Sequence, residues 1–375
     1  MKVLLVTQSF LPKKGGAQFA VHHLANRFVA LGHDVTVLNS STREVPDAAR
    51  YAVRKYSILP GSTRFGYHRW PGFLVNRYRL DRKIAALGPD AVMVHFAWPV
   101  GIWVGTIGLD IPFSITCHGP GLNVTPSGPR ACYRYRIDPL LAKSMNDASA
   151  AVAISAHARS VMLDIGVIPE RIVQIPNGVD VGKFSEVSGF NLRAHFGIPE
   201  RAKVLLSVGR ESYAKAYDVA LKAFSMIADR DVYYVILGAG VSAWRPYAEE
   251  LGCGDRVVTC EGLYGEELIG AYQQADVFTL PSIKELCPLV VPEAMAAGRA
   301  IVVTNVSGSQ DMIAHGENGL VVEPGSAEAL AGAWASLLED RILRVRMGEE
   351  NLRRAPRYDW SDIARRHLEC VGVKA

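Results

Sequence analysis

Two glutamates, Glu285 and Glu293, stand eight positions apart in the stretch 281–298, which reads P-S-I-K-E-L-C-P-L-V-V-P-E-A-M-A-A-G. Residues 275–280 form an apolar, β-rich run typical of a buried strand, whereas 290–297 is helix-forming. We therefore expect Glu285 on a loop at the carboxyl end of a strand and Glu293 one to two turns into the following helix. Backbone N–H groups at that helix start would suit a phosphate, and the flanking carboxylates would accept hydrogen bonds from hydroxyls. This chemistry matches a nucleotide sugar.

Two cations follow another predicted strand. The strand 203–208 leads into G-R-E-S-Y-A-K-A at 209–216, where Arg210 and Lys215 precede a predicted helix over 217–228. Arginine can grip two phosphate oxygens at once, whereas lysine acts as a point charge. The pair could therefore neutralise a diphosphate as it leaves.

Two glycines and a histidine stand at the ends of strands in the first third of the chain. Gly15 and Gly16 separate the predicted strand 2–7 from a predicted helix, where they could let the backbone approach a phosphate or a sugar. A turn that needs positive φ explains them equally well. His118 follows the predicted strand 112–117. Ligands of open α/β sheets bind at such strand ends, although a lone histidine is more often structural.

The segment 232–243 suggests a different enzyme class. A predicted strand ends in G-A-G-V-S-A, beginning at Gly238, which fits the G-x-G-x-x-G/A fingerprint of dinucleotide-binding folds. That fingerprint normally opens the first βαβ unit of its domain, whereas here it follows an earlier strand and helix. The acid expected about 20 residues later is ambiguous between Asp255 and Glu261. The pattern therefore favours a nucleotide-sugar enzyme over an NAD enzyme.

The frame around the two acids, P-S-x-x-E before and E-A-M-A-x-G after, closely resembles the E-x7-E signature of the retaining glycosyltransferases of family 4. The loop 209–216 resembles the family's G-R…K-G motif, with Ala216 where glycine is usual, and P-N-G-V-D at 176–180 also matches. L-C-P at 286–288 stands where Gly-Phe-Gly is common, which leaves the donor open. The resemblance implies an α/β protein of the GT-B fold, with two Rossmann-like doubly wound domains facing an interdomain cleft.

The resemblance also implies roles for individual residues. The diphosphate would lie against Arg210, Lys215 and the backbone of 286–289, with the sugar hydroxyls at Glu285 and the ribose at Glu293. The residues expected to act in catalysis are His118, Arg210, Lys215 and Glu285. Those expected to bind the donor are Gly15, Gly16, Asn177, Gly209, Tyr264, Leu286, Cys287, Pro288, Leu289 and Glu293. No residue is identified as a nucleophile, and the resemblance implies a front-face mechanism in which the leaving phosphate helps to deprotonate the acceptor.

The length of 375 residues favours two domains. By resemblance, residues 1–180 would form the acceptor-binding domain, with a C-terminal helix in 358–375 packing back on it, and 181–357 the donor-binding domain. The glycines and proline of 181–200 predict an interdomain linker. The D-x-D look-alike at 229–231 falls between a helix and a strand, at the end of the sheet away from the site. We therefore expect a turn there, and neither a metal nor another cofactor.

The bulk composition, 49% hydrophobic and 21% charged, is typical of an α/β globular protein, and no apolar run reaches the length of a membrane span. Six cysteines without a C-x-x-C pattern favour free thiols in a reducing cytoplasm. The net charge of +4 combines +9 over 1–180 with −5 over the remainder. The stretch 50–83 holds nine Lys and Arg against Asp81, with interleaved aromatics. It predicts contact with an anionic membrane surface or acceptor rather than nucleic acid, with a solvated loop as the alternative.

Together these features predict a retaining glycosyltransferase that moves a hexose-type sugar from a UDP- or GDP-linked donor. The acceptor would be a glycan, a lipid-linked or an anionic molecule, in the synthesis of cell-envelope polysaccharide, lipopolysaccharide or glycolipid. The enzyme would be cytoplasmic and peripheral at the inner membrane face. The alternatives are a nucleotide-sugar epimerase of the same architecture and a non-catalytic nucleotide-sugar-binding protein.

Overall fold

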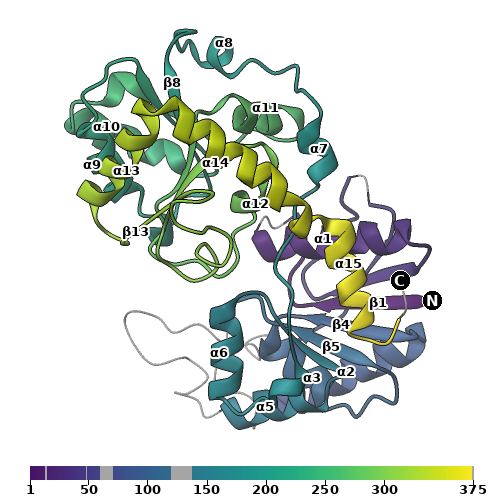
Figure 1. Cartoon of the computed structure of the whole chain (residues 1–375). Coiled ribbons are helices and arrows are strands. Elements are labelled where there is room, and N and C mark those ends of the chain that lie inside the picture. The colour runs from purple at the N-terminus through teal and green to yellow at the C-terminus, as the bar shows by residue number, and fades with distance from the viewer. Residues whose placement is uncertain (13–14, 48, 60–70, 120–136, 374–375) are drawn as a thin grey trace. The chain divides into compact units, whose positions relative to one another are not determined.

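The computed structural model describes residues 1–12, 15–47, 49–59, 71–119 and 137–373. The chain divides into two compact units, and each is described by itself (Figure 1). Unit 1 comprises residues 1–177 and 360–375, and unit 2 comprises residues 178–359. The chain therefore passes between units after Asn177 and after Asp359, a few residues away from the predicted boundaries at 180 and 357.

Unit 1 is built on a seven-stranded parallel sheet with the strand order β3-β2-β1-β4-β5-β6-β7. Its strands are β1 Lys2–Thr7, β2 Asp34–Asn39, β3 Ala52–Lys55, β4 Ala91–His95, β5 Phe113–Thr116, β6 Ala150–Ala153 and β7 Ile172–Gln174. Strand β1 lies between β2 and β4, pairing Val3 with both Val35 and Ala91. The central strands read as continuous apolar runs because helices cover both faces of the sheet.

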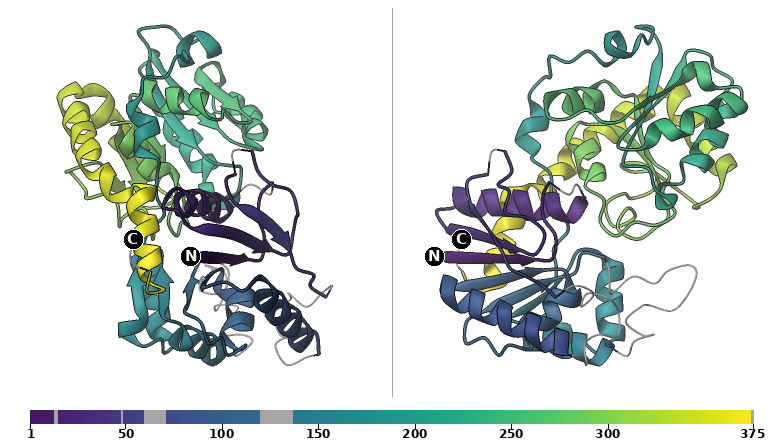
Figure 2. Two further views of the ribbon diagram at one scale, coloured as in Figure 1. Left: turned by 90° about the vertical axis from the view of Figure 1, so that its right-hand side faces the viewer. Right: turned by 180° about the vertical axis from the view of Figure 1, so that it is seen from behind.

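The helices of unit 1 form two groups on opposite faces of that sheet (Figures 1 and 2). One group pairs α1 Gly16–Ala30 with α15 Trp360–Glu369, and the other contains α2 Pro71–Leu87, α3 Ile102–Gly105 and α5 Asp138–Asp147. A further helix, α6 Ala156–Asp164, follows β6. The ring of His23 on α1 stacks on Trp360, which is buried, with centroids 5.2 Å apart. The last helix of the chain is therefore part of unit 1.

Unit 2 is built on a six-stranded parallel sheet with the order β10-β9-β8-β11-β12-β13. Its strands are β8 Lys203–Val208, β9 Val232–Leu237, β10 Val257–Cys260, β11 Val277–Leu280, β12 Ala300–Thr304 and β13 Leu320–Val322. Its helices are α7 Val181–Ser185, α8 Leu192–Phe196, α9 Tyr217–Ser225, α10 Arg245–Glu250, α11 Glu266–Gln274, α12 Val290–Ala296, α13 Ala327–Glu339 and α14 Arg341–Arg354. The buried indole of Trp334 donates a hydrogen bond to Thr279 Oγ1 at 3.0 Å, which joins α13 to the middle of the sheet.

Residues 181–200 are not the free linker that their glycines predicted. They form α7 and α8, which pack against α11. The Gln273 side-chain amide donates to the Phe184 carbonyl at 3.0 Å, and its oxygen accepts from the Ser188 N–H at 3.0 Å. Gln274 likewise accepts from the Leu192 N–H at 3.0 Å. The prediction failed because composition reports chain flexibility but not the side chains that another helix supplies.

Among the described residues, no helix combines the length and apolar character that crossing a membrane requires.

Candidate active site

Each sheet changes winding direction at one point, between β1 and β4 in unit 1 and between β8 and β11 in unit 2. Open α/β sheets bind ligands outside the carboxyl ends of the strands at such a switch point. In unit 2, the loops 209–216 and 281–289 follow the two strands that flank it. The loop with the cations and the loop with Glu285 therefore meet at the place where this fold provides a binding site.

An ion pair joins these two loops. Lys215 Nζ lies 2.6 Å from Glu285 Oε1, and the two side chains are only 16% and 13% exposed. The Ser282 hydroxyl donates to the same carboxylate oxygen at 2.8 Å, and the Ile283 N–H donates to the Ala214 carbonyl at 2.9 Å. The structure thus brings together two of the predicted catalytic side chains and fixes both.

Arg210 occupies a different environment in the same loop. Its side chain is exposed, and within the described part of the chain it makes no ion pair. The loop around it is held by the Tyr217 hydroxyl, which donates to the Gly209 carbonyl at 2.8 Å. The guanidinium is therefore available to an anionic ligand, while its backbone is anchored.

Ala216 shows why glycine is usual at its position. Its backbone has φ +48° and ψ +45°, in the left-handed region. A Cβ in that region costs about 1–2 kcal/mol. The turn survives the substitution, and Lys215 keeps its place beside Glu285.

Two glycines let neighbouring loops approach closely at the same sheet edge. A Cβ on Gly308, where φ is +82°, would lie 2.2 Å from the Leu286 carbonyl oxygen. A Cβ on Gly238, where φ is +150°, would lie 2.2 Å from the Gly209 carbonyl oxygen. The loop 286–289 predicted to face the diphosphate is thus supported from behind by the loop after β12, with Cys287 and Pro288 buried and Leu286 and Leu289 half-buried.

Glu293 lies in the first turn of α12, slightly nearer the helix start than predicted, and is partly buried. Its Oε2 accepts a hydrogen bond from the Tyr272 hydroxyl of α11 at 2.7 Å. Burial raises the pKa of the Glu293 carboxyl to about 7, although the bond from Tyr272 acts in the opposite direction. The two acids of the E-x7-E pattern therefore differ, since Glu285 is paired with a lysine whereas the pKa of Glu293 is raised by burial.

The glycine turn after β9 already has an anionic partner. The Glu261 carboxylate accepts a hydrogen bond from the Gly240 N–H at 2.6 Å and others from the hydroxyl and N–H of Ser242. These N–H groups are the ones that a dinucleotide phosphate would need. A fixed carboxylate there repels a phosphate, which argues against the hypothesis that this glycine turn binds NAD.

Three histidines meet at the switch point of unit 1. His118 lies two residues after β5 and is 7% exposed. Its Nε2 lies 2.9 Å from Nδ1 of His95, the last residue of β4, and the His95 ring is 6.2 Å from that of His367 on α15. Sequence reasoning missed His95, although it stands at a strand end as His118 does. No local signal marks His367, because only the packing of the last helix brings it here.

The remaining predicted donor-binding residues occupy varied positions. Gly15 has an extended φ of −175° and Gly16 begins α1, so the explanation that their turn needs positive φ is wrong. Asn177 is buried at the end of unit 1, and Tyr264 is exposed on the loop after β10. Residues 13–14 of the first loop lie outside the described residues.

Three of the seven aromatic residues in 50–83 do not lie on the surface that their interleaving suggested. Tyr51, Tyr56 and Phe73 are buried in the core, because β3 and α2 turn them inward. Arg64, Phe65, Tyr67, Arg69 and Trp70 lie outside the described residues. On α2, Leu74 and Tyr78 are 60% and 62% exposed, and Arg79 and Arg82 are exposed beside them.

Other charged groups of unit 2 neutralise one another. Asp229 pairs with Lys203 at 3.2 Å and Asp231 with Arg201 at 3.4 Å, so the D-x-D look-alike is a charged turn. Within the described ranges, no group of three or more His, Cys, Asp or Glu is arranged to hold a metal.

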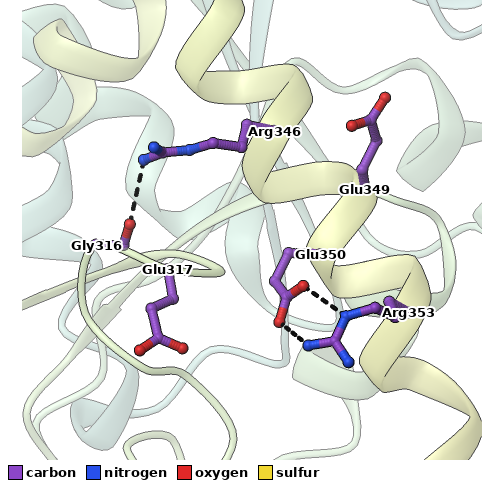
Figure 3. Close-up of a pocket in the computed structure, with 6 residues that line it drawn as sticks. All are labelled: Gly316, Glu317, Arg346, Glu349, Glu350 and Arg353. Carbon is purple, nitrogen blue, oxygen red and sulfur yellow. Dashed lines mark hydrogen bonds and ion pairs between the residues drawn. The ribbon is translucent and has the colours of Figure 1, made fainter.

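A shallow hollow of about 480 Å³ lies beside α14 (Figure 3). There Arg353 pairs with Glu350, and Arg346 donates to the Gly316 carbonyl at 3.3 Å. Because these groups are satisfied within the hollow, it is a poorer candidate than the switch point.

Two family models match successive parts of the chain. The model described as Glycosyltransferase Family 4 matches residues 14–183, and that described as Glycosyl transferases group 1 matches residues 190–354. The chain belongs to the family 4 glycosyltransferases. This membership places it among transferase enzymes and agrees with the resemblance carried by the E-x7-E frame.

Relatives of this family 4 glycosyltransferase fall into two kinds. The D-inositol 3-phosphate glycosyltransferase of Corynebacterium glutamicum is 34% identical over 209 residues, which are 52% of this chain and 50% of that protein. This chain thus spans about half the length of several curated relatives that it matches. An uncharacterized glycosyltransferase of Methanocaldococcus jannaschii is 26% identical over 97% of this chain and 96% of its own length.

Solved structures share the fold along the whole chain. The HepE protein of Anabaena in complex with UDP is 19% identical and superposes with a TM-score of 0.81, covering 99% of this chain and 100% of its own. WaaG, a glycosyltransferase involved in lipopolysaccharide biosynthesis, is also 19% identical, with a TM-score of 0.76 over 98% of this chain and 99% of its own. The predicted GT-B fold class, with two parallel α/β domains, is therefore confirmed.

Proposed function

We propose that this family 4 glycosyltransferase moves a hexose-type sugar, with retention of configuration, from a nucleoside-diphosphate sugar that unit 2 binds. The observation that carries the proposal is the Lys215–Glu285 pair at the switch point of unit 2, in a loop that also bears the exposed side chain of Arg210. This arrangement offers cations to a diphosphate and a carboxylate to sugar hydroxyls within one pair of loops.

Each group has a distinct role in the proposed reaction. Arg210 and Lys215 stabilise the negative charge that develops on the diphosphate as the glycosidic bond breaks. Glu285, held by Lys215 and Ser282, accepts hydrogen bonds from the sugar, and Glu293 accepts them from the ribose. His118 touches the transferred sugar. The leaving phosphate takes the acceptor proton, so that the reaction proceeds without a metal or another cofactor.

The acceptor is expected to be a glycan, a lipid-linked or an anionic molecule bound by the positively charged first domain, in the synthesis of envelope polysaccharide, lipopolysaccharide or glycolipid. The names of D-inositol 3-phosphate glycosyltransferase and of WaaG support these classes. UDP is the nucleotide to test first, because HepE has been crystallised with UDP and with UDP-glucose. GDP remains the second candidate.

A thermal-shift screen against UDP, GDP, ADP and NAD, with and without magnesium, tests the donor site. We expect a rise of a few degrees with one nucleoside diphosphate, independent of magnesium. Arg210→Ala should remove most of that rise, whereas Arg341→Ala, an exposed arginine on α14, should not. Stabilisation by NAD alone would overturn the proposal. Unchanged turnover in the Arg210→Ala/Lys215→Ala double variant would defeat the role in leaving-group departure.

The two rival functions have their own signatures. An epimerase would convert a nucleotide sugar into its epimer with no acceptor present. A non-catalytic binding protein would bind the nucleotide and show no turnover with any donor and acceptor pair.

We also propose that the enzyme is cytoplasmic and docks on an anionic membrane through α2. Leu74, Tyr78 and Arg82 are four residues apart along this helix and exposed, so that they form one stripe with Arg79 beside it. The double change Leu74→Ser/Tyr78→Ser should reduce flotation with phosphatidylglycerol vesicles. The same change at Ile342 and Val345, exposed on α14 of unit 2, is the matched control. Equal flotation of all three proteins would refute this docking surface.

A further inference from the structure

His95, His118 and His367 form a cluster of buried side chains. His95 is 0% exposed and His367 is 3% exposed, so neither can reach a substrate directly. The three come from the end of β4, the loop after β5 and the last turns of α15. Three elements far apart in the sequence thus meet around the His95 ring, and His118 is the least buried of the three histidines.

A single hydrogen bond couples the protonation of two rings. His95 Nδ1 and His118 Nε2 are 2.9 Å apart, with the rings nearly parallel at an interplanar angle of 20°. Burial lowers the pKa of His118 to about 4 and that of His95 well below its usual value, so both rings are neutral at pH 7. One proton therefore lies between them. Whichever ring donates it, the hydrogen-bonding character of His118 Nδ1 is decided at the same time.

The other side of His95 indicates which ring donates. Its Nε2 is buried and has no hydrogen-bond partner within the described part of the chain. If His118 donated, His95 Nε2 would carry a buried N–H with no acceptor, and orphaned buried N–H groups are rarer than orphaned acceptors. If His95 Nδ1 donates instead, its Nε2 carries no proton and is only a buried acceptor without a donor among the described residues. His118 then carries its own proton on Nδ1.

His367 packs against the His95 ring of this pair. Its ring lies 6.2 Å from His95 at an angle of 37°, and its Nδ1 also lacks a partner among the described residues. Unpaired buried nitrogens cost about 1–3 kcal/mol each. A fold that retains two of them in one cluster gives up stability for the arrangement of the imidazoles.

We propose that His95 is a positioning residue of the transferase, which holds His118 in its Nδ1–H tautomer so that His118 donates a hydrogen bond to a hydroxyl of the transferred sugar. His367 fixes the His95 ring from behind, so that the C-terminal helix contributes to sugar recognition. The inference rests on the proposed function, because it takes His118 to face the donor sugar.

The tautomer can be measured on the full-length protein without any substrate. Two-bond proton–nitrogen NMR spectra of protein with ¹⁵N-labelled histidine distinguish the two neutral tautomers, and the loss of one signal set in His118→Gln assigns His118. We expect His118 to be the Nδ1–H form at pH 7. An Nε2–H form of His118 in the wild-type protein would overturn the proposal.

Two variants of His95 link the tautomer to sugar binding. His95→Asn places an amide donor near the position of Nδ1 and should keep the His118 tautomer, whereas His95→Leu should release His118 to the Nε2–H form or to a mixture. Calorimetric titration with UDP-glucose and with UDP then separates the sugar from the nucleotide. In His95→Leu, the affinity for UDP-glucose should fall about tenfold, the worth of one good hydrogen bond. The affinity for UDP should stay within about twofold, since unit 2 retains its donor loops.

The outcomes distinguish this proposal from the proposed function. A changed tautomer in His95→Leu with unchanged affinity for UDP-glucose would refute the role in sugar recognition. If the wild-type protein binds neither UDP-glucose nor any other nucleoside diphosphate, the proposed function fails, while the NMR result still decides whether His95 sets the tautomer. If His95→Leu does not fold, the wild-type spectrum and His95→Asn still carry the test.

Discussion

Replacing Glu293 by glutamine should change stability and ligand binding in opposite directions. The carboxyl is partly buried beside α11, and burial raises its pKa from 4.5 to about 7, while one hydrogen bond from Tyr272 offsets part of that cost. Glutamine keeps an oxygen that can accept the Tyr272 proton but never ionises. The variant therefore isolates the cost of burying a negative charge from the shape of the side chain.

The size and sign of the effect follow from the pKa shift. Below pH 4.5 the carboxyl is protonated in the folded and the unfolded protein alike. Between pH 4.5 and about 7 the folded protein holds a proton that the unfolded protein has lost, so the free energy of unfolding falls as pH rises. Above about pH 7 both states are ionised and the folded state carries the full penalty. At 1.36 kcal/mol per pKa unit, that penalty is about 3 kcal/mol.

Urea denaturation of wild-type protein and Glu293→Gln at pH 5 and at pH 8.5 measures this penalty. The difference between the two proteins at each pH cancels the other titrating groups. It should move by about 2.5 kcal/mol in favour of the variant at the higher pH, since a small part of the penalty is already present at pH 5. Glu349→Gln, a change at an exposed position of α14, is the control and should show no such movement. A difference that stays constant between the two pH values would refute the account of Glu293.

The function of Glu293→Gln supplies the second half of the prediction. If the carboxylate accepts hydrogen bonds from both ribose hydroxyls, an amide can accept from only part of that pair, and nucleotide affinity at pH 8 should fall about tenfold. If the variant is more stable than the wild-type protein yet binds the nucleotide more weakly, the Glu293 carboxylate serves ligand binding at a cost in stability. Unchanged affinity would remove Glu293 from the donor site.

Two further predictions concern the loops and the metal. Gly308→Ala and Gly316→Ala face the same backbone strain, with φ of +82° and +80°, but only the first would bring a Cβ within 2.2 Å of the Leu286 carbonyl. We expect Gly308→Ala to weaken nucleotide binding more than Gly316→Ala does, and also to lower the unfolding temperature more. Calorimetry that shows equal effects of the two changes would contradict the idea that Gly308 supports the loop 286–289. Because Asp229 and Asp231 are paired with cations, transferase activity should survive dialysis against EDTA, and activity that returns only when Mg²⁺ or Mn²⁺ is added would show a metal requirement.

Much of unit 2 could be predicted from the sequence, because its strands and loops are short and are marked by local residue patterns. Apolar runs predicted β8, β9 and β11, and the residues after them predicted the loops at the carboxyl ends of these strands. The helix after the cation loop is shorter than predicted, because it ends at Ser225 rather than Ala228. Local patterns fix the type of an element more firmly than its ends.

The tertiary structure decided which of these residues meet. Lys215 and Glu285 are separated in the chain by three strands, β9, β10 and β11, yet they form an ion pair because β8 and β11 are neighbours in the sheet. The sequence carries both residues but not the strand order that pairs them. The same holds for burial, since Tyr51 and Tyr56 look like surface aromatics in a basic stretch until β3 and its neighbours enclose them.

The histidine cluster is the clearest case of contacts that could not be predicted from the sequence. A strand-end signal pointed to His118, and the same signal was present at His95, but nothing in the local sequence distinguishes His367 from any other helical histidine. Its place beside His95 depends on the final helix packing against α1 in the first unit. The resemblance of its motifs identified the family, and residue type and periodicity by themselves predicted the parallel strands and the loops that follow them. Only long-range packing, which sets distances between residues remote in the chain, decided their partners, burial and protonation.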